Sequence, residues 1–352
     1  MYKVCFVLPG IGRHPVGGYK MTYEYANRLV AEGCDVSILF MNELLYKKYK
    51  VPQFIKTNIV NQMTKIEPKW FNLDSRIKKV STLEHNYEKK LANLDVCVAT
   101  AVETVDTVFY DIKARKKVYY IQDYEDWKTD SSYVQKTFAL GMDNIVISTW
   151  LKKIVDQYSK EPSILIQNPI ETGKYIAKIP MSNRQKHTIA LLYHEGAHKG
   201  LNNAFKVLDR VKELYPDLQV KMFGQFPKPK IPDWIEYIRG ASQDQTVDIY
   251  NWCQVFLCST IKEGYGLTGI EAMSCGACLV STGYEGAKEY AINEYNSLLS
   301  PIGDIQAQVN NVVRIFEDID LRNSISSNGI ESANKYSWEE AMNKFNKVIG
   351  YI

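Results

Sequence analysis

The chain has 352 residues, of which 45% are hydrophobic and 24% charged, and its formal net charge is +3. These values lie near the averages for folded globular domains, and the length exceeds what one hydrophobic core usually holds, so we expect two domains of about 150–200 residues. No apolar run approaches the ~20 residues of a membrane span, and the start MYKVCFVLPG is typical of a strand rather than a signal peptide, which predicts a cytoplasmic protein.

Strand-like apolar runs alternate with helix-like segments along the first half of the chain. The runs are VCFVLP, DVSILF, DVCVAT, KVYYIQ and NIVIST, and an amphipathic helix is predicted over 19–32. After about residue 170 the alternation restarts with the runs TIALLYH, VKMFG, WIEYIRG, VFLCST and CLVST, and with helices over about 201–214, near 244–252 and from about 268. This spacing indicates parallel sheets built from βαβ units, so two similar α/β halves are predicted.

A proline marks the expected join between these halves. In IQNPIETGKY, 166–175, Asn-Pro breaks the alternating pattern, because the residue before proline avoids the helical region. We therefore expect an α/β fold with domains over 1–170 and 171–335. Ligands of such sheets bind at the carboxyl ends of the strands, so functional residues are sought in the loops that follow strands.

Neither the cysteines nor the short acidic motif of the chain predicts a metal site. The seven cysteines are scattered and several lie in apolar runs, which is typical of free thiols in a reducing compartment. Cys275 and Cys278 form a C-x-x-C without a second pair or a nearby histidine, so we interpret them as packing residues. Asp318 and Asp320 form a D-x-D in a helix-like surface segment, and no metal ligand is assigned there.

The stretch 41–90 is more basic than the rest of the chain, with eleven Lys and Arg against five Asp and Glu. Aromatic residues are interspersed with these charges: Tyr46, Tyr49, Phe54, Trp70 and Phe71. Such a stretch can rest on an anionic membrane surface, with lysines near the headgroups and rings at the interface. A solvated face of the domain is an equally good interpretation. Nucleic acid is not expected, because no nucleic-acid motif accompanies the charge.

The loop after the first strand, PGIGRHPVGGYK at 9–20, is rich in glycine. Gly17 and Gly18 precede the first expected helix, where backbone amides can bind a phosphate group. The spacing is not G-x-G-x-x-G, so a dinucleotide site is not indicated. A phosphate-binding loop and a flexible turn stay equal alternatives for this segment.

A second candidate segment is YIQDYEDW, 120–127, at the end of another apolar strand. A carboxylate at Asp123 can orient or deprotonate an acceptor hydroxyl. Asp123 or Asp126 can also simply cap the next segment, and this stretch taken alone favours that interpretation.

The third segment, LLYHEGAHKGLNNAF at 191–205, places His194, His198 and Lys199 between a strand and a helix. The helix dipole opposes a cation at the start of a helix, so Lys199 predicts a neighbouring anion. His194 taken alone is more typical of a histidine that is satisfied at the end of a strand.

The fourth segment, EGYGLTGIEAMSCG at 263–276, holds two carboxylates around a Gly-Tyr-Gly turn. Thr268 and Glu271 fit the capping-box pattern, in which threonine caps a helix and glutamate returns to the cap amide. Glu263 lies before the turn and outside the expected helix, next to exposed backbone amides. Amides attract phosphate and a carboxylate accepts hydrogen bonds from hydroxyls, so the segment suits a ligand that carries both groups.

This last segment resembles the E-x7-E signature of retaining glycosyltransferases of the GT-B architecture, family 4. Other pieces follow the order of that family: the glycines at 17–18, VISTWLKKIVDQY followed by IQNPIE, the Lys-Gly of HKGL, and the terminal YSWEEAMNKFNKVI. The resemblance implies two Rossmann-like domains whose parallel sheets face a central cleft, and a terminal helix over 336–352 that crosses back to the first domain. The form QDYEDW resembles bacterial rhamnosyltransferases and related cell-surface polysaccharide enzymes.

The resemblance also implies a role for each matching residue in binding a nucleotide-sugar donor. Glu271 holds the ribose hydroxyls, and Glu263 lies beside the transferred sugar. Lys199 neutralises the donor diphosphate. The remaining donor contacts come from the backbone of Gly17, Gly18, Gly264, Tyr265, Gly266 and Leu267.

Two positions depart from the family pattern. His194 stands where the family usually has arginine, and a neutral or half-charged histidine supports a diphosphate less than a bidentate arginine does. Either His194 is charged in the complex or another cation compensates. Gln122 stands where many members have histidine; it cannot act as an acid or base, which makes Asp123 the more interesting residue.

The implied activity is transfer of a hexose or deoxyhexose, with retention of configuration, to a glycan or lipid-linked glycan. We expect this reaction at the inner face of the cell membrane, and we expect Trp127 and residues 41–90 to face the acceptor. No cofactor or metal is expected, because Lys199, His194 and the amides at 17–18 stabilise the leaving diphosphate. Two other classes stay open: another two-Rossmann enzyme, such as an epimerase or a phosphorylase, and a non-catalytic nucleotide-sugar-binding partner.

Overall fold

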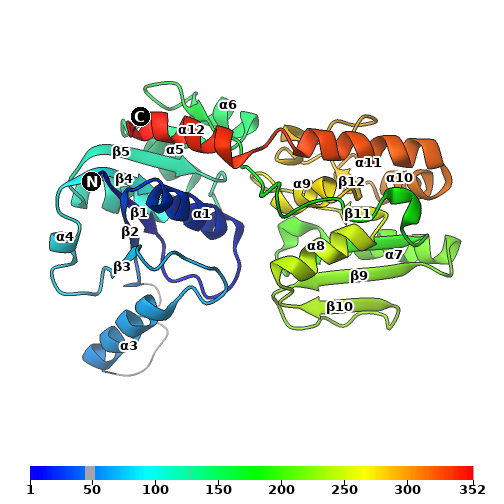
Figure 1. Ribbon diagram of the computed structural model, residues 1–352, viewed down its shortest axis with the longest axis horizontal. Coiled ribbons are helices and arrows are strands. Elements are labelled where there is room, and N and C mark those ends of the chain that lie inside the picture. The colour runs from blue at the N-terminus through cyan, green and yellow to red at the C-terminus, as the bar shows by residue number, and fades with distance from the viewer. Residues whose placement is uncertain (44–51, 128, 352) are drawn as a thin grey trace. The chain divides into compact units, whose positions relative to one another are not determined.

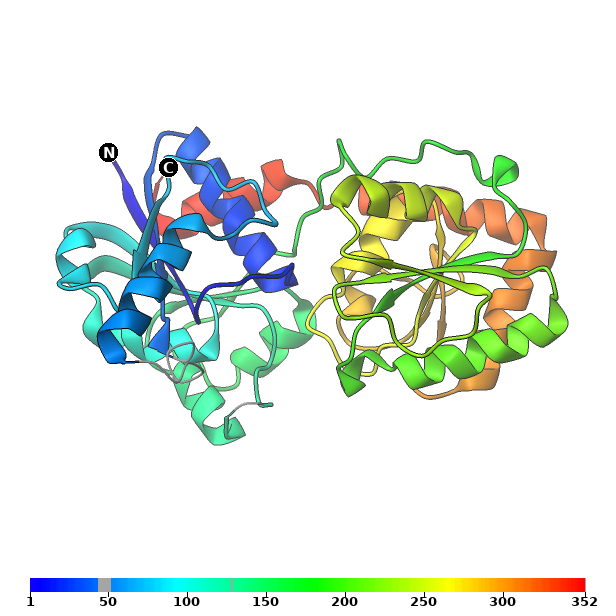
Figure 2. The same ribbon diagram turned by 90° about the horizontal axis from the view of Figure 1, so that it is seen from below.

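The computed structural model of the protein shows two α/β units (Figures 1 and 2). The described residues are 1–43, 52–127 and 129–351. Tyr46 and Tyr49, two aromatic residues of the basic stretch, lie outside them.

One unit consists of residues 1–167 with 341–352, and the other of residues 168–340. The division lies between Gln167 and Asn168, inside the segment where the Asn-Pro step predicts a join. Every pair of strands in the described sheets is parallel, which confirms the α/β class that the alternation of strands and helices predicts.

The first unit has a seven-stranded sheet in the order β3-β2-β1-β4-β5-β6-β7. Its strands are β1 (Lys3–Leu8), β2 (Asp35–Phe40), β3 (Lys78–Ser81), β4 (Leu94–Ala99), β5 (Ala114–Ile121), β6 (Asp143–Val146) and β7 (Ile164–Leu165). Its helices are α1 (Gly17–Ala31), α3 (Gln53–Ile66), α4 (Tyr87–Lys90), η1 (Val102–Thr104), η2 (Thr107–Asp111), α5 (Ser131–Phe138), α6 (Thr149–Val155) and most of α12 (Trp338–Ile349). The central strand β1 pairs with β2 and β4, so its buried side chains form the middle of the core.

The second unit has a six-stranded sheet in the order β10-β9-β8-β11-β12-β13. Its strands are β8 (Thr188–Tyr193), β9 (Gln219–Gly224), β10 (Ile235–Arg239), β11 (Val255–Cys258), β12 (Cys278–Thr282) and β13 (Ser297–Ser300). Its helices are η3 (Met181–Asn183), η4 (Ala197–Lys199), α7 (Leu201–Leu214), α8 (Gln243–Trp252), α9 (Leu267–Ser274), η5 (Ala287–Glu289), α10 (Ile305–Glu317) and α11 (Ile319–Ala333). Helices cover both faces of this sheet, with α7 beside α10 and α9 beside α11 (Figure 2).

The sequence predicts some of the elements and misses others. The helix expected over 201–214 is confirmed as α7 and the one near 244–252 as α8. The strands β3, β7 and β13 and the helices α3 and α10 are absent from the prediction. Strand length alone does not explain the missed strands, because β6 and β11 also have four residues and are predicted.

The last helix belongs to the core of the unit in which the chain begins. Phe345 in α12 is fully buried, and its ring lies 4.5 Å from Tyr25 in α1 and 6.1 Å from Phe6 in β1, measured between centroids. Asn346 adds a hydrogen bond from its side-chain amide to the carboxylate of Glu32 at 2.8 Å. Removal of this helix would therefore expose the first sheet.

The described aromatic residues of the basic stretch differ in exposure and packing. Trp70 donates its indole N–H to the carbonyl of Gly12 at 2.9 Å, and the rings of Trp70 and Phe71 lie 5.7 and 5.3 Å from Tyr23. These two rings pack the chain against α1 and remain half-buried, and the membrane interpretation of the basic stretch stays a prediction. Phe54 in α3, by contrast, is 69% exposed. Among the described residues, no helix has the length and apolarity to cross a membrane.

Candidate functional site

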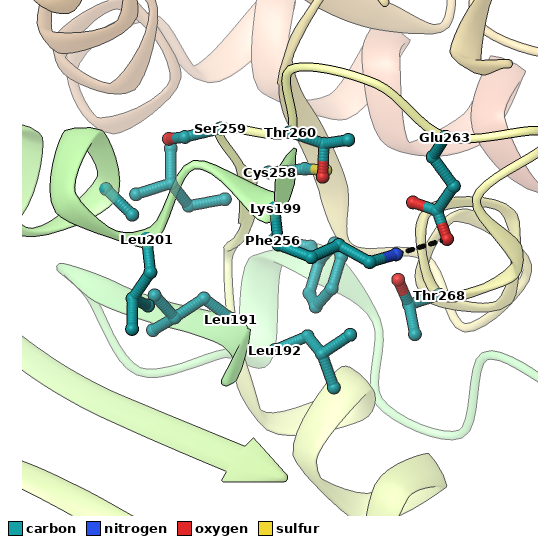
Figure 3. Close-up of a pocket in the computed structure, with 12 residues that line it drawn as sticks. Leu191, Leu192, Lys199, Leu201, Phe256, Cys258, Ser259, Thr260, Glu263 and Thr268 are labelled. Atoms are coloured by element: carbon teal, nitrogen blue, oxygen red, sulfur yellow. Dashed lines mark hydrogen bonds and ion pairs between the residues drawn. The ribbon is translucent and has the colours of Figure 1, made fainter. Parts of the chain in front are cut away.

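Lys199 and Glu263 form an ion pair beyond the central strands of the second sheet (Figure 3). The Nζ of Lys199 lies 2.5 Å from Oε1 of Glu263, and the two side chains are 16% and 26% exposed. Lys199 ends η4, between β8 and α7, and Glu263 lies in the loop between β11 and α9. Glu263 is therefore the anion that the position of Lys199 predicts.

The turn after Glu263 is packed tightly against the chain that follows β12. Gly266 has a φ of +92°, and a Cβ there would lie 2.0 Å from the hydroxyl oxygen of Tyr284. Tyr290 donates its hydroxyl to the carbonyl of Gly266 at 2.7 Å. A Cβ at Gly286 would lie 2.6 Å from the carbonyl oxygen of Glu263. These contacts fix the backbone around Glu263 and the start of α9, and they require glycine at positions 266 and 286.

The capping box predicted for this helix is wrong. Helix α9 begins at Leu267, its N-cap is Gly266, and no side chain caps it. Thr268 is the second helical residue, so the T-x-x-E pattern is out of register with the cap. Glu271 is instead 5% exposed inside the fold, with the hydroxyl of Tyr250 3.5 Å from its carboxylate. Glu271 follows Thr268 by three positions, so the two side chains share one face of α9.

The ion pair lines a pocket whose remaining wall is part apolar and part polar (Figure 3). The apolar residues are Leu191, Leu192, Leu201, Ala204, Phe256 and Leu257, and the polar ones are Cys258, Ser259, Thr260 and Thr268. The sequence patterns considered above do not single out Ser259 and Thr260. Both end the run VFLCST directly after β11, so the tendency of ligands to bind at the carboxyl ends of strands identifies them in retrospect.

His194 and His198 lie beside the ion pair as neutral groups. Nδ1 of His194 accepts a hydrogen bond from the N–H of Gly196 at 2.9 Å, which places the ring proton on Nε2. Burial and the charge of Lys199 lower the pKa of His194, and the same two causes lower the pKa of His198. A neutral histidine therefore stands where the resemblance implies an arginine.

Gly17 and Gly18 belong to the first unit, where they are the first two residues of α1 rather than part of a loop before it. No side chain caps this helix. A Cβ at Gly18 would lie 3.2 Å from the side-chain nitrogen of Gln122, tighter than most real contacts. Gln122 therefore packs directly on the first turn of α1.

Asp123 also lies in the first unit and does not cap a helix. The next helix, α5, is capped by Asp130, whose carboxylate accepts a hydrogen bond from the N–H of Ser132. The interpretation of Asp123 or Asp126 as that cap is therefore wrong. Asp123 instead accepts a hydrogen bond from the N–H of the next residue, Tyr124, at 2.8 Å.

The residues of the two short metal-like motifs have structural roles. Asp318 caps α11 by accepting a hydrogen bond from the N–H of Leu321 at 2.9 Å. Cys275 and Cys278 are buried and free. Within the described residues, no three His, Cys, Asp or Glu side chains gather in a group that could hold a metal ion.

The two units define a protein of the GT-B fold class. The structure resembles the crystal structure of the Anabaena protein Alr3699/HepE in complex with UDP-glucose, with a TM-score of 0.76, 13% identity and coverage of 100% of both chains. At this identity the likeness shows the fold alone: two Rossmann-like α/β domains, which the sequence resemblance implies as well.

Residues 178–332, which lie in the second unit, match the family described as Glycosyl transferases group 1. The uncharacterized glycosyltransferase MJ1178 of Methanocaldococcus jannaschii is 23% identical over 226 residues, which cover 61% of this chain and 62% of that protein. The capsular polysaccharide biosynthesis glycosyltransferase CapM of Staphylococcus aureus is 30% identical over 105 residues, 28% of each chain. The chain thus spans less than two thirds of the length of these relatives.

Proposed function

We propose that the protein is a glycosyltransferase that takes a hexose or deoxyhexose from a nucleoside-diphosphate sugar, with retention of configuration and without a catalytic metal. The observation that carries the proposal is the ion pair of Lys199 and Glu263 in the pocket. A cation that binds phosphate and a carboxylate that accepts hydrogen bonds from hydroxyls lie 2.5 Å apart there. That arrangement suits a ligand with a diphosphate next to a sugar.

The donor is held mainly by the second unit. Lys199 neutralises the diphosphate, and the backbone at 264–267 adds amides at the start of α9, where the helix dipole favours an anion. His194 contributes a hydrogen bond from Nε2–H rather than a charge. Glu271 accepts hydrogen bonds from the ribose hydroxyls, and Glu263 accepts them from the transferred sugar.

The first unit binds the acceptor in this proposal. The first-turn amides of Gly17 and Gly18 are placed at a helix N-terminus, which suits a phosphate group. The carboxylate of Asp123 suits an acceptor hydroxyl, because a carboxylate accepts hydrogen bonds on both of its oxygens. The matching relative CapM, named for capsular polysaccharide biosynthesis, supports a glycan acceptor of the cell surface.

We also propose that the first unit contacts the membrane that carries a lipid-linked acceptor. Along α3, Ile55, Ile59 and Ile66 are 37%, 44% and 58% exposed on one side of the helix, and Phe54 at its start is 69% exposed. Apolar side chains of an interfacial helix insert between headgroups while neighbouring lysines remain at the anionic surface.

The donor site is tested by thermal stabilisation with UDP, GDP, TDP and ADP, each with and without EDTA. A nucleotide at 100 times its dissociation constant adds about 2.7 kcal/mol of stability. We expect one nucleotide to give a shift that EDTA does not change and that Glu271→Ala abolishes. Transfer of sugar from the matching donor then separates an enzyme from a non-catalytic binding protein. Absence of a shift with all four nucleotides contradicts the proposed function.

The membrane contact is tested by sedimentation with liposomes that contain phosphatidylserine, at low salt. We expect the wild type to sediment and the double variant Phe54→Ser/Ile59→Ser to stay in the supernatant. Tyr110→Ser is the matched control, because Tyr110 is 67% exposed in the same unit but outside α3. Wild-type protein that does not sediment removes the membrane part of the proposal.

A further inference from the structure

We propose that Glu263 discriminates between the donor and the product, because it weakens the binding of a free nucleoside diphosphate and favours the same nucleotide with a sugar attached. This inference rests on the proposed donor site. It concerns the ion pair of Glu263 with Lys199, in which Glu263 already holds the cation that would bind the phosphate.

The surroundings make this ion pair stronger than a surface one. Both side chains are largely buried, at 16% and 26% exposed, and the pocket wall beside them includes Leu192 and Phe256 (Figure 3). Apolar neighbours exclude water and reduce the screening of charge, so attraction and repulsion between groups in the pocket both increase. A diphosphate must therefore compete with a well-placed carboxylate for Lys199.

The two ligands differ in what they offer Glu263 after that competition. A free diphosphate takes hydrogen bonds from Lys199 and leaves Glu263 without its cation, close to a second anion. The carboxylate of Glu263 and a neighbouring phosphate are both negative, so they repel each other. A nucleotide sugar brings hydroxyl donors next to the diphosphate, and these can satisfy the carboxylate that Lys199 has released. The same carboxylate therefore weakens the binding of the free diphosphate and strengthens the binding of the nucleotide sugar.

The neighbouring histidines do not remove the repulsion between Glu263 and a free diphosphate. Burial and Lys199 lower the pKa of both His194 and His198, and the Nδ1 of His194 already accepts a hydrogen bond from Gly196. An arginine at 194 would leave a second cation in place to hold Glu263 or the diphosphate. The histidine at this position therefore makes the ligand-dependent exchange at Lys199 more important in this protein. A weakly bound diphosphate also leaves quickly after transfer, when product release can limit turnover.

The test is calorimetric titration of wild type and Glu263→Gln with UDP, GDP, TDP and ADP and with the glucose conjugate of each. Glutamine keeps the shape of the side chain and removes its charge. For the nucleotide that binds wild type, we expect Glu263→Gln to bind the free diphosphate about tenfold more tightly, since roughly 1.4 kcal/mol of repulsion is relieved. The affinity for the conjugate should stay the same or fall.

Two variants control the experiment. Glu263→Asp keeps the charge, so it should retain the weak binding of the diphosphate and rule out an effect of side-chain shape. Glu331→Gln removes the charge of Glu331 in α11, which pairs with Lys335 just after that helix. Both side chains are 64% exposed, so the substitution should change neither affinity.

Each outcome decides between the two proposals. If wild type binds a nucleotide and Glu263→Gln binds the diphosphate equally or less tightly, the inference is wrong while the donor site stands. An equal gain for diphosphate and conjugate also overturns it, because Glu263 then only repels anions. If no nucleotide binds wild type, both the proposed function and this inference fail.

Discussion

Gly200 lies against the backbone of Ser259, so closely that a Cβ on Gly200 would be 1.9 Å from the carbonyl oxygen of Ser259. This contact joins the residue after Lys199, at the start of α7, to the end of β11, from which the chain continues to Glu263. Gly200 also has a φ of +65°, a conformation that other residues adopt at a cost. One glycine therefore sets the distance between the two loops that carry the ion pair.

The first prediction is that Gly200→Ala destabilises the protein by more than about 2 kcal/mol, because positive φ and a backbone clash combine. Urea unfolding monitored by circular dichroism measures the loss. Gly173→Ala is the matched control, since a Cβ at Gly173 meets no atom within 4 Å, and it should change stability by less than about 0.5 kcal/mol. Equal stability of the two variants would show that the loops adjust freely.

The second prediction concerns Arg184, a residue that the sequence did not single out. It is 6% exposed and donates hydrogen bonds to four backbone carbonyls. The acceptors belong to Ile179, Tyr250, Cys253 and Cys275. Lysine cannot reproduce the planar fork, so Arg184→Lys should cost about 3 kcal/mol of unfolding free energy.

Arg210→Lys is the control for that substitution, because Arg210 lies on the surface of α7 with one hydrogen bond to Gln306. We expect a change of less than about 0.5 kcal/mol there. Chemical denaturation of both variants makes the comparison. A loss at Arg184 no larger than the loss at Arg210 would mean that the buried carbonyls find other donors.

The third prediction is a loss of stability with falling pH that comes from the histidines of the pocket. The pKa values of His194 and His198 are lowered in the fold, so below about pH 6.5 the unfolded chain binds more protons than the folded one. The stability that these two histidines contribute is complete above that pH and is lost as the pH falls towards their lowered pKa values. Carboxylates titrate mainly below pH 5, outside this window.

Denaturation at pH 5.5, 6.5 and 7.5 measures this slope. His194→Gln, which keeps a hydrogen-bonding side chain but does not titrate, should have a smaller decrease in unfolding free energy between pH 7.5 and 5.5 than the wild type. His85→Gln, a substitution in the first unit, should keep the wild-type slope. A slope that His194→Gln leaves unchanged would exclude His194 as its source.

The sequence predicts the residues of the site more readily than their relationship. Apolar runs locate β8 and β11, and the loops after them contain Lys199 and Glu263, as the strand-end rule expects. Their pairing is tertiary, because two loops far apart in the sequence meet only when β8 and β11 lie side by side. The local pattern at Thr268 is misleading for the same reason: packing of Gly266 against Tyr284 sets the start of α9.

The same limit applies to the aromatic residues of the first unit. Composition alone groups Phe54 and Trp70 in one basic stretch, and it contains no information about which ring packs against the domain. Contacts with Tyr23 and Gly12 show that Trp70 does so, half-buried. Phe54 remains exposed because α3 presents it to solvent. A surface that is predicted from composition therefore needs the fold to show which of its residues are exposed.

The fourth prediction concerns Lys199 itself. Lys199→Met removes the cation of the pocket and leaves the carboxylate of Glu263 to repel the diphosphate, so the affinity for the nucleotide should fall and kcat/KM with the donor should drop by about 10²–10³. Lys335→Met, on the exposed pair with Glu331, is the control and should retain wild-type values.

A double-mutant cycle then separates the two parts of the argument. If Lys199 and Glu263 act through each other, Glu263→Gln should change the affinity for the free diphosphate by a different factor in the Lys199→Met background than in the wild type, because Glu263 then has no cation to occupy. The two substitutions should then be non-additive by about 0.5–3 kcal/mol, as expected for charged groups in contact. Additive effects would mean that the two residues bind separate parts of the ligand and that the ion pair has no influence on affinity.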